Sequence, residues 1–466
     1  MGGEWIVEIE RALGCVDLDI VKTGSICRVP NKIREAEAEA QDKDKDKGYC
    51  YRPRFVAMGT IHRATSRSDL QIMEVTKWRY MKSLLSRSGS RGEDMKKTLK
   101  DCCKAIKTIE GQIRASYVEK IDMGAEEFAR VMLLDACYLF ELLLRLKENR
   151  TDDPPMDNKE KMLRLLTDLT LLENQIPFLL LTILHERLFT AQQHKSVPSP
   201  QQLAESLFEC NLAGGAHFLH LIHSCSPDTY ENKKERGKHP QLQRCARKLQ
   251  AFGIRIIGKA SETKYSDGNK ESDIVTAALR EFVDKFNFEI TFEGGKLEIP
   301  TLHIKEATEV KWRNLIAWEQ IGLTGIGYKF TSYAYFFKGL VCSLDDLKLL
   351  KHKGVITVHN EAINDEDLVK MFQSITNGAE QMDSRYRTIC EGLNNAEVKG
   401  VAGRRVLVFT MSWHYLRYFV EGSKFWLFRL AYIYLGTAWR IAGVFSGIAL
   451  FGLTITQTVY SIRAVE

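Results

Sequence analysis

Apolar residues recur every three or four positions through much of the chain, the spacing that places side chains on one face of an α-helix. The pattern predicts helices at residues 69–87, 93–119, 125–147, 160–174, 177–190, 240–252, 272–285, 306–320, 332–352 and 363–393. Trp5, Ile6, Ile9 and Leu13 share this spacing, so we expect a short amphipathic helix within residues 1–22. The chain is therefore predicted to be mainly α.

One segment has the period of a β-strand instead. In residues 286–292 (FNFEITF) apolar and polar side chains alternate strictly, and Gly294-Gly295 then precedes a second short alternating run at residues 297–299. Alternation on both sides of a glycine pair is typical of a β-hairpin. We expect a large helical globular domain with a small β-hairpin element.

The end of the chain has a different hydrophobic pattern. Residues 441–462 contain no charged side chain, and about 22 residues at roughly 1.5 Å each could cross a hydrocarbon core of about 30 Å. A buried core helix is the alternative, but such helices seldom run this long without a charge. The sequence predicts one C-terminal transmembrane helix, with the lipid bilayer as a partner.

The residues around this span predict how it would sit. Arginine and lysine are frequent before residue 441 and only four residues follow the span, so the positive-inside rule favours a cytosolic location for most of the chain. The plasma membrane is a candidate location. Gly443 and Gly447 have the GxxxG spacing that lets two membrane helices approach closely, so a homodimer through the span is a further hypothesis.

Composition shifts divide the chain into segments. We expect an N-terminal amphipathic helix at 1–22, a helical domain at 23–415, an aromatic and basic juxtamembrane segment at 416–440, and the span at 441–462. Within the domain, residues 35–47 (EAEAEAQDKDKDK) are highly charged and of low complexity, which predicts a solvated insertion or loop.

Charge and motifs exclude several function classes. The formal net charge is only +6 over 466 residues, and basic and acidic residues are interleaved, so no nucleic-acid partner is expected. The sequence has no Walker-type phosphate loop, dinucleotide-binding glycine motif, HExxH, GxSxG or kinase signature. We therefore assign no cofactor and no catalytic residue.

The best candidate for a metal site is a run of histidines. His217, His220 and His223 precede Cys225, and on a helix two of the imidazoles could share a face. No second group of ligands accompanies them. We favour histidines that face solvent or cap the segment after Gly214-Gly215, and we assign no metal.

Polar residues inside apolar runs are the remaining candidates for chemistry. They are Glu173, Asn174 and Gln175 in one run, Asn314, Glu319 and Gln320 in another, and Asp135 on an otherwise apolar stretch. A buried carboxylate is costly unless it is paired, so partners such as Arg164, Arg313 or backbone amides near Pro177 are expected. Glu173 could be a general acid or base, or the set could be a network that joins helices. We favour the network.

Several of these runs resemble one plant-specific family. Four runs follow the order of motifs in proteins with domain of unknown function 247, also called UPF0481 proteins. They are Ile26–Pro30 (ICRVP), Leu171–Phe178 (LLENQIPF), which includes Pro177, Leu297–Leu302 (LEIPTL) and Asn314–Gln320 (NLIAWEQ). The family usually has Gly-Pro-x-His where this chain has Gly59-Thr60-Ile61-His62.

The resemblance implies membrane attachment but no established activity. Some grass relatives are proposed to act in self-incompatibility, as recognition proteins. We carry forward a membrane-anchored interaction, recognition or signalling protein with a protein partner. The alternative is a membrane-tethered enzyme that uses buried carboxylates such as Glu173 and Asp135. An open pocket around these acids would favour the enzyme.

Overall fold

The structure is a computed structural model, and it describes most of the chain. The described residues are 25–40, 49–63, 68–89, 92–153, 156–189, 197–208, 216–226, 228, 230, 241–259, 273–283, 286–322, 326–360, 362–396, 450–451 and 453–454. Contacts divide the chain into one unit of residues 1–250 and 254–396 and another of residues 251–253 and 397–466. The fold described below belongs to the first unit.

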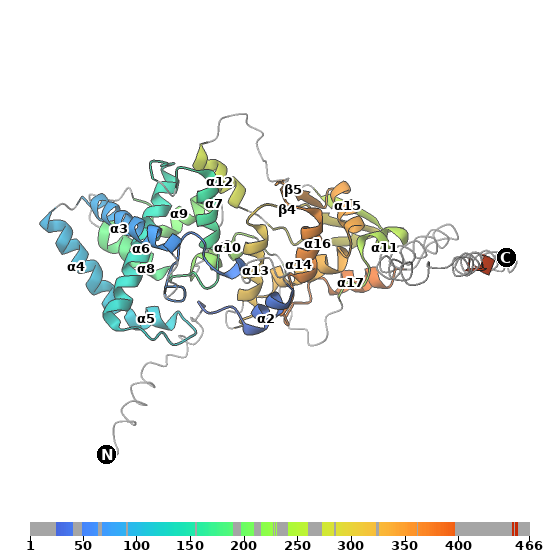
Figure 1. Cartoon of the computed structure of the whole chain (residues 1–466), viewed down its shortest axis with the longest axis horizontal. Helices are drawn as coiled ribbons and strands as arrows, with labels where there is room; N and C mark the ends of the chain where they lie inside the picture. Colours follow the sequence, from blue (N-terminus) through green and yellow to red (C-terminus); the bar gives the residue numbers. More distant parts are fainter. Residues whose placement is uncertain are drawn as a thin grey trace, which may run out of the picture. The chain divides into compact units, whose positions relative to one another are not determined.

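A long central helix organises the N-terminal half of this unit. Helix α6 (Ala125–Lys147) is apolar almost all round and is buried over nearly its whole length, as expected for a helix surrounded by others. Four helices contact it (Figure 1). They are α3 (Ser68–Arg87), α4 (Glu93–Thr108), α8 (Leu179–Phe189) and α9 (Pro200–Phe208).

Shorter helices complete this half. Helix α7 packs against α12, which follows it by more than a hundred residues. These shorter helices are α5 (Glu110–Ala115), α7 (Lys159–Asp168), α10 (Phe218–Ser224) and α12 (Ile274–Phe282). Two elements from early in the chain, α2 (Asn31–Ala40) and η1 (Tyr49–Tyr51), instead place Ile33, Cys50 and Tyr51 in the core of the C-terminal half. The charged run predicted as a loop at 35–47 is helical up to Ala40, and residues 41–48 lie outside the described residues.

The C-terminal half contains two small sheets. In the first, β1 (Arg255–Lys259) runs parallel to β3 (Lys296–Pro300), and β3 pairs antiparallel with β2 (Thr291–Glu293). In the second, β4 (Leu302–Ile304) runs parallel to β5 (Ile356–Val358). The predicted hairpin is therefore confirmed at β2–β3, where Gly294 and Gly295 both have positive φ.

The first half of the predicted strand is not a strand. Residues 286–290 make no ladder, because their alternating side chains turn into an aromatic cluster. Phe286 and Phe288 each meet Phe330 with ring centroids 5.1 Å apart. The alternation in residues 286–290 therefore indicates that every second side chain is buried. A β-strand also needs a neighbouring strand, and β3 provides one for residues 291–293.

Six helices pack around the sheets. They are α11 (Ala246–Ala251), α13 (Thr308–Glu319), α14 (Lys329–Leu340), α15 (Leu344–His352), α16 (Asp365–Ser374) and α17 (Arg387–Asn394). The predicted helix at 332–352 is two helices, because Ser343 accepts a hydrogen bond from the Asp346 amide and starts α15. The prediction at 93–119 similarly divides at Ile109 into α4 and α5.

The two halves have separate hydrophobic cores. One core gathers residues of α3, α4, α6 to α10 and α12, and the other gathers the sheets, α11 and α13 to α17. Where the chain crosses from one core to the other, adjacent residues belong to different cores. Ile26 belongs to the first core and Cys27 to the second, and Phe218 and Leu219 divide in the same way.

The predicted fold class is wrong in one part, the C-terminal transmembrane helix. Among the described residues, no helix combines the length and the apolar character needed to cross a bilayer. Even α6, with 23 residues, carries Asp135, Glu141 and Arg145. Of the predicted span only Leu450, Phe451, Leu453 and Thr454 are described. The rest of 441–462, with Gly443 and Gly447, and the segments 1–22 and 416–440 lie outside the described residues.

Candidate functional site

The loop between α7 and α8 lies on the boundary between the two cores. Leu169 and Ile176 pack in the N-terminal core, whereas Leu172 packs in the C-terminal core. Glu173, Asn174 and Gln175 lie between these anchors and are each about 2% exposed. The loop therefore brings three polar side chains into the interior, where each needs a partner.

Glu173 holds the segment that enters the domain. Its Oε1 accepts a hydrogen bond from the Val29 amide at 2.8 Å and another from the Arg34 guanidinium. The Nε2 atom of His62 lies 3.3 Å from its Oε2. The predicted partners Arg164 and Arg313 are wrong. Arg164 pairs with Glu160 at the surface, and Arg313 binds Glu309 and Ser374.

Asn174 and Gln175 replace the backbone pairing that a sheet would provide. Asn174 accepts from the Met58 amide at 2.6 Å and donates to the carbonyls of Val56 and Asp168. Gln175 accepts from the Leu219 amide at 2.9 Å and donates to the carbonyls of Leu169 and Leu171. Both amides are thus fully used in binding the main chain, and Pro177 follows them at the start of the turn into α8.

Sequence reasoning missed Asp168, although it carries the same signal of an acid inside an apolar run. Its carboxylate accepts from the amides of Arg54, Phe55 and Val56 at 2.6–3.1 Å. Burial raises the pKa of Asp168 to about 7, and the three amide donors act in the opposite direction. Residues 54–58 belong to no helix or strand, and the side chains of Asp168 and Asn174 bind their main chain.

Asp135 has a buried cation as its partner. The Nζ atom of Lys77 lies 2.7 Å from Asp135 Oδ1, and both side chains are fully buried. The Gly59 amide donates to Asp135 Oδ2 at 2.8 Å. Burial raises the pKa of Asp135, and Lys77 opposes that rise. Lys77 was also missed; its signal is a cation on the apolar face that Met73, Tyr80 and Leu84 define.

Asn314 connects the second predicted group to this loop. It accepts from the Leu172 amide at 2.9 Å and donates to the carbonyl of Cys50 at 2.7 Å. It thereby ties α13 to the α7–α8 loop and to η1. Gly59 and His62, at the position where the family motif differs, also reach this network through Asp135 and Glu173.

Glu319 and Gln320 lie at the other end of α13 and form a separate cluster. Glu319 accepts from the amides of Phe330 and Thr331 at 3.0 and 2.8 Å, so it caps the first turn of α14. Burial raises the pKa of Glu319 to about 7. Gln320 donates to the Gln381 carbonyl and accepts from the Glu380 amide.

The histidines of α10 face the interior rather than solvent, contrary to the prediction. All three rings pack on Trp318, with centroids 4.9–5.2 Å away. His217 does cap the helix, since its Nδ1 accepts from the His220 amide. His223 Nε2 lies 3.1 Å from Glu319 Oε1. Across the described residues, no three His, Cys, Asp or Glu side chains converge in a way that could hold a metal ion.

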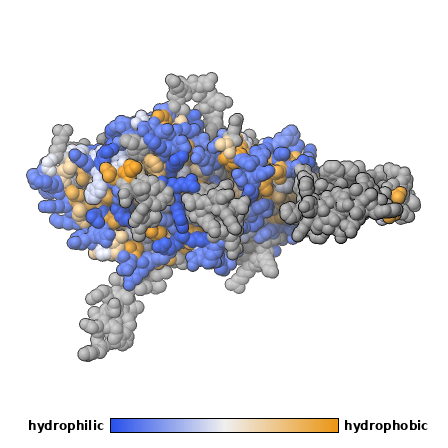
Figure 2. Space-filling model, viewed as in Figure 1, coloured by the Kyte–Doolittle hydropathy of each residue, from blue (hydrophilic) through white to orange (hydrophobic). Residues whose placement is uncertain are grey.

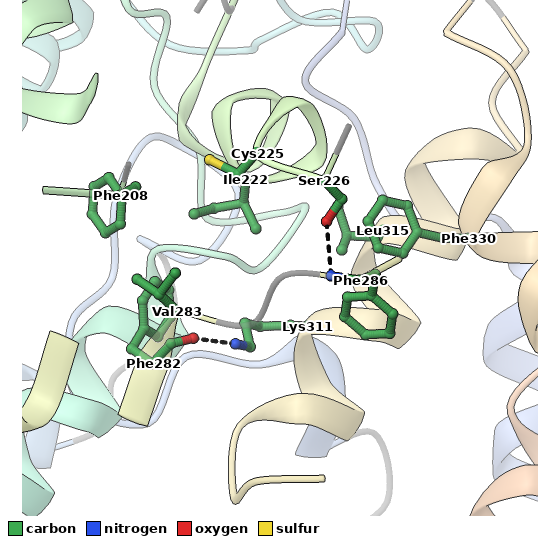
Figure 3. Close-up of a pocket in the computed structure, with 10 residues that line it drawn as sticks. All are labelled: Phe208, Ile222, Cys225, Ser226, Phe282, Val283, Phe286, Lys311, Leu315 and Phe330. Atoms are coloured by element: carbon green, nitrogen blue, oxygen red, sulfur yellow. Dashed lines mark hydrogen bonds between the residues drawn. The ribbon is translucent and has the colours of Figure 1, made fainter. Parts of the chain in front are cut away.

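One cavity at the boundary has a volume of about 10 Å³, close to the least that holds one water molecule. Its walls are mostly apolar, including Phe208, Phe282 and Phe330 (Figure 3). Its lysine, Lys311, donates to the Phe282 carbonyl. Neither Glu173 nor Asp135 lines it, so these acids meet backbone and cations instead of open space.

The surface carries a different feature. Ile72, Val75 and Trp78 on α3 are 72%, 63% and 51% exposed. Residues three apart share one face of a helix, and exposed Arg79 and Lys82 continue this same face. At the left of Figure 2, where Figure 1 places α3, hydrophobic residues gather among hydrophilic ones. We call these five residues the α3 face.

Comparison with known proteins decides the family. The profile of domain of unknown function 247, described as a plant protein of unknown function, matches residues 26–452. The chain belongs to this family.

The family assignment confirms the resemblance drawn from the sequence motifs. A UPF0481 protein of Arabidopsis thaliana is 24% identical over 383 residues, which cover 78% of each chain. No solved structure matches this domain-of-unknown-function 247 chain. Its motif residues Glu173, Asn174, Gln175 and Asn314 form the network at the boundary of the two cores, and Glu319 and Gln320 form the cluster at the start of α14.

Proposed function

We propose that this protein is an interaction protein that binds a partner through the α3 face. The observation that carries the proposal is the exposed row of Ile72, Val75 and Trp78. A large aromatic side chain beside aliphatic neighbours is the usual anchor of a protein interface. Such a row on a regular helix fits an amphipathic helix of a partner protein.

The charges beside the row indicate the chemistry of that partner. Arg79 and Lys82 lie on the same face and are exposed. The guanidinium of Arg79 forms a long ion pair with Asp153, with 4.0 Å between nitrogen and oxygen. Helix α4 contacts α3 and exposes lysines at 96, 97, 100, 104 and 107. A helix with apolar anchors and acidic flanks would therefore complement this surface in shape and charge.

The alternative, an enzyme that uses buried carboxylates, has less support. Glu173 and Asp135 are each bound by main-chain amides and cationic side chains. A general acid or base must come within hydrogen-bond reach of its substrate, whereas Glu173 is 2% exposed and Asp135 is fully buried. We therefore infer structural roles for both acids, Glu173 at the boundary of the two cores and Asp135 inside the N-terminal core.

A comparison of variants tests the proposal. The tagged full chain and its Val75→Asp/Trp78→Asp variant are purified from plant cells, and co-purifying proteins are quantified by mass spectrometry. We expect at least one protein to fall tenfold or more with the variant, because aspartate desolvates poorly and repels an acidic flank. The matched control is Ile257→Asp, on an exposed apolar residue of β1. A set of proteins unchanged across all three chains would contradict the proposal.

A further inference from the structure

The apolar residues of the α3 face, Ile72, Val75 and Trp78, are exposed among the described residues, and the first residues of the chain have the complementary character. Trp5, Ile6, Ile9 and Leu13 recur at helical spacing. On a helical projection Glu8 and Glu10 flank this apolar side, one on each edge. Residues 1–24 hold five acidic and two basic side chains. The segment is therefore complementary to the α3 face, which has exposed apolar residues beside Arg79 and Lys82.

The chain is long enough to place this segment there. The described residues begin at Ser25, whose amide donates to the Ser116 carbonyl at 3.0 Å. Ile26 belongs to the same hydrophobic core as Met73 of α3, and Cys27 to the other core, so the described chain begins at the boundary of the half that contains α3. The twelve steps from Leu13 to Ser25 can extend about 40 Å. Helix α3, with 20 residues, is about 30 Å long.

We infer that residues 4–16 of this chain dock on the α3 face as an amphipathic helix and compete there with the partner. The inference rests on the proposed function for the partner, but the docking itself does not need one. Trp5 and Ile9 pack against Val75 and Trp78, and the acidic flank meets Arg79 and Lys82. An attached segment acts at a high effective concentration, so a partner must displace it.

Hydrogen exchange on the full chain tests the docking. Amides of residues 5–16 are expected to exchange at least tenfold more slowly in the wild type than in Val75→Asp/Trp78→Asp, with Ile257→Asp behaving as the wild type. Equal exchange in all three chains overturns the inference. If slow exchange depends on protein concentration, and sedimentation shows a dimer that the double variant abolishes, the occupant is a second copy and docking within one chain is wrong.

Binding of a probe separates this inference from the proposed function. A fluorescent peptide of residues 1–22 is titrated into the full chain and into Trp5→Ala/Ile9→Ala. We expect the variant to bind the peptide at least tenfold more tightly, because its own segment no longer covers α3. Equal affinities overturn the competition. A third outcome is that the amides of residues 5–16 exchange slowly but no co-purifying protein depends on the α3 face. That outcome would overturn the proposed function and leave the docking of residues 4–16 intact.

Discussion

At the scale of single residues, the molecule uses side chains to bind main chain that has no strand neighbour. Asp168 accepts hydrogen bonds from main-chain amides within residues 54–58, and Asn174 accepts one from an amide and donates one to a carbonyl of the same segment. Each such bond contributes about 1 kcal/mol, but an unmet buried donor costs about 1–3 kcal/mol. The polar residues inside apolar runs thus bind main chain, and some of their partners lie far away in sequence, 144 positions for Glu173 and Val29 and 264 for Asn314 and Cys50.

The Lys77–Asp135 pair gives the first prediction. Asp135→Asn removes the buried countercharge of Lys77 and leaves Glu74, 2.7 Å away and 36% exposed, as its anionic partner, so the free energy of unfolding should fall by about 3 kcal/mol. Replacing both members, in Lys77→Met/Asp135→Leu, should recover part of that loss. Urea denaturation followed by circular dichroism measures both. Lys161→Met, which breaks an exposed pair with Asp157, serves as the control and should change stability by less than about 1 kcal/mol.

His217 gives a prediction for pH. Burial lowers its pKa to about 3, below the value near 6.5 of the unfolded chain, so this residue stabilises the fold above pH 6.5 and loses that contribution as the pH falls toward 3. His217→Asn keeps a cap acceptor but does not titrate. Between pH 7 and pH 5 the wild type should lose about 2 kcal/mol relative to this variant. Parallel stability curves for the two proteins would contradict this assignment.

At the scale of elements, close approaches of backbone fix how the small sheets meet the helices. Gly258 in β1 donates to the Lys353 carbonyl at 2.8 Å, at the end of α15. A Cβ atom at Gly258 would lie 2.2 Å from the Gly354 carbonyl group. The glycine is therefore needed because the two backbones touch, and its own conformation is not the reason.

Gly258→Ala should force β1 away from the turn before β5. We expect the free energy of unfolding to fall by about 1–3 kcal/mol, as in other overpacked cores. Thermal denaturation measures the change. Gly111→Ala is the matched control, because nothing lies within 4 Å of the Cβ it would gain. Equal losses in the two variants would show that the close approach does not matter.

At the scale of the whole molecule, the polar network lies at the boundary of the two cores and bonds residues on both sides of it. Asn314 bonds the α7–α8 loop and η1 at once. Leu172, in the same loop, packs in the C-terminal core although its neighbour Leu169 packs in the N-terminal one. We expect the halves to unfold together while this network is intact.

Asn314→Ala tests the coupling. It leaves the Leu172 amide and the Cys50 carbonyl unmet, so stability should fall by about 2–4 kcal/mol. Hydrogen exchange should also rise at residues 49–51 and 169–176 together, on both sides of the boundary. Asn394→Ala removes an amide that binds Gln241 and Gln243 within one half, and should affect that half alone. If faster hydrogen exchange in the Asn314→Ala variant is confined to α13, the network does not couple the two cores.

The sequence by itself determined what depends on neighbouring residues. The spacing of apolar side chains placed α6 at Ala125–Lys147, and alternation around Gly294-Gly295 predicted the β2–β3 hairpin. The motifs identified the family. The predicted C-terminal transmembrane helix is corrected by the structure, since among the described residues no helix is both long and apolar enough to cross a bilayer.

The tertiary structure alone decided which distant groups meet. Arg34 pairs with Glu173, 139 positions away, and Lys77 pairs with Asp135. The parallel pairing of β1 with β3 likewise has no local signal. The physical reason is that periodicity reports only whether a side chain is buried. Which partner satisfies a buried charge depends on how the two cores pack, and that packing is a property of the whole chain.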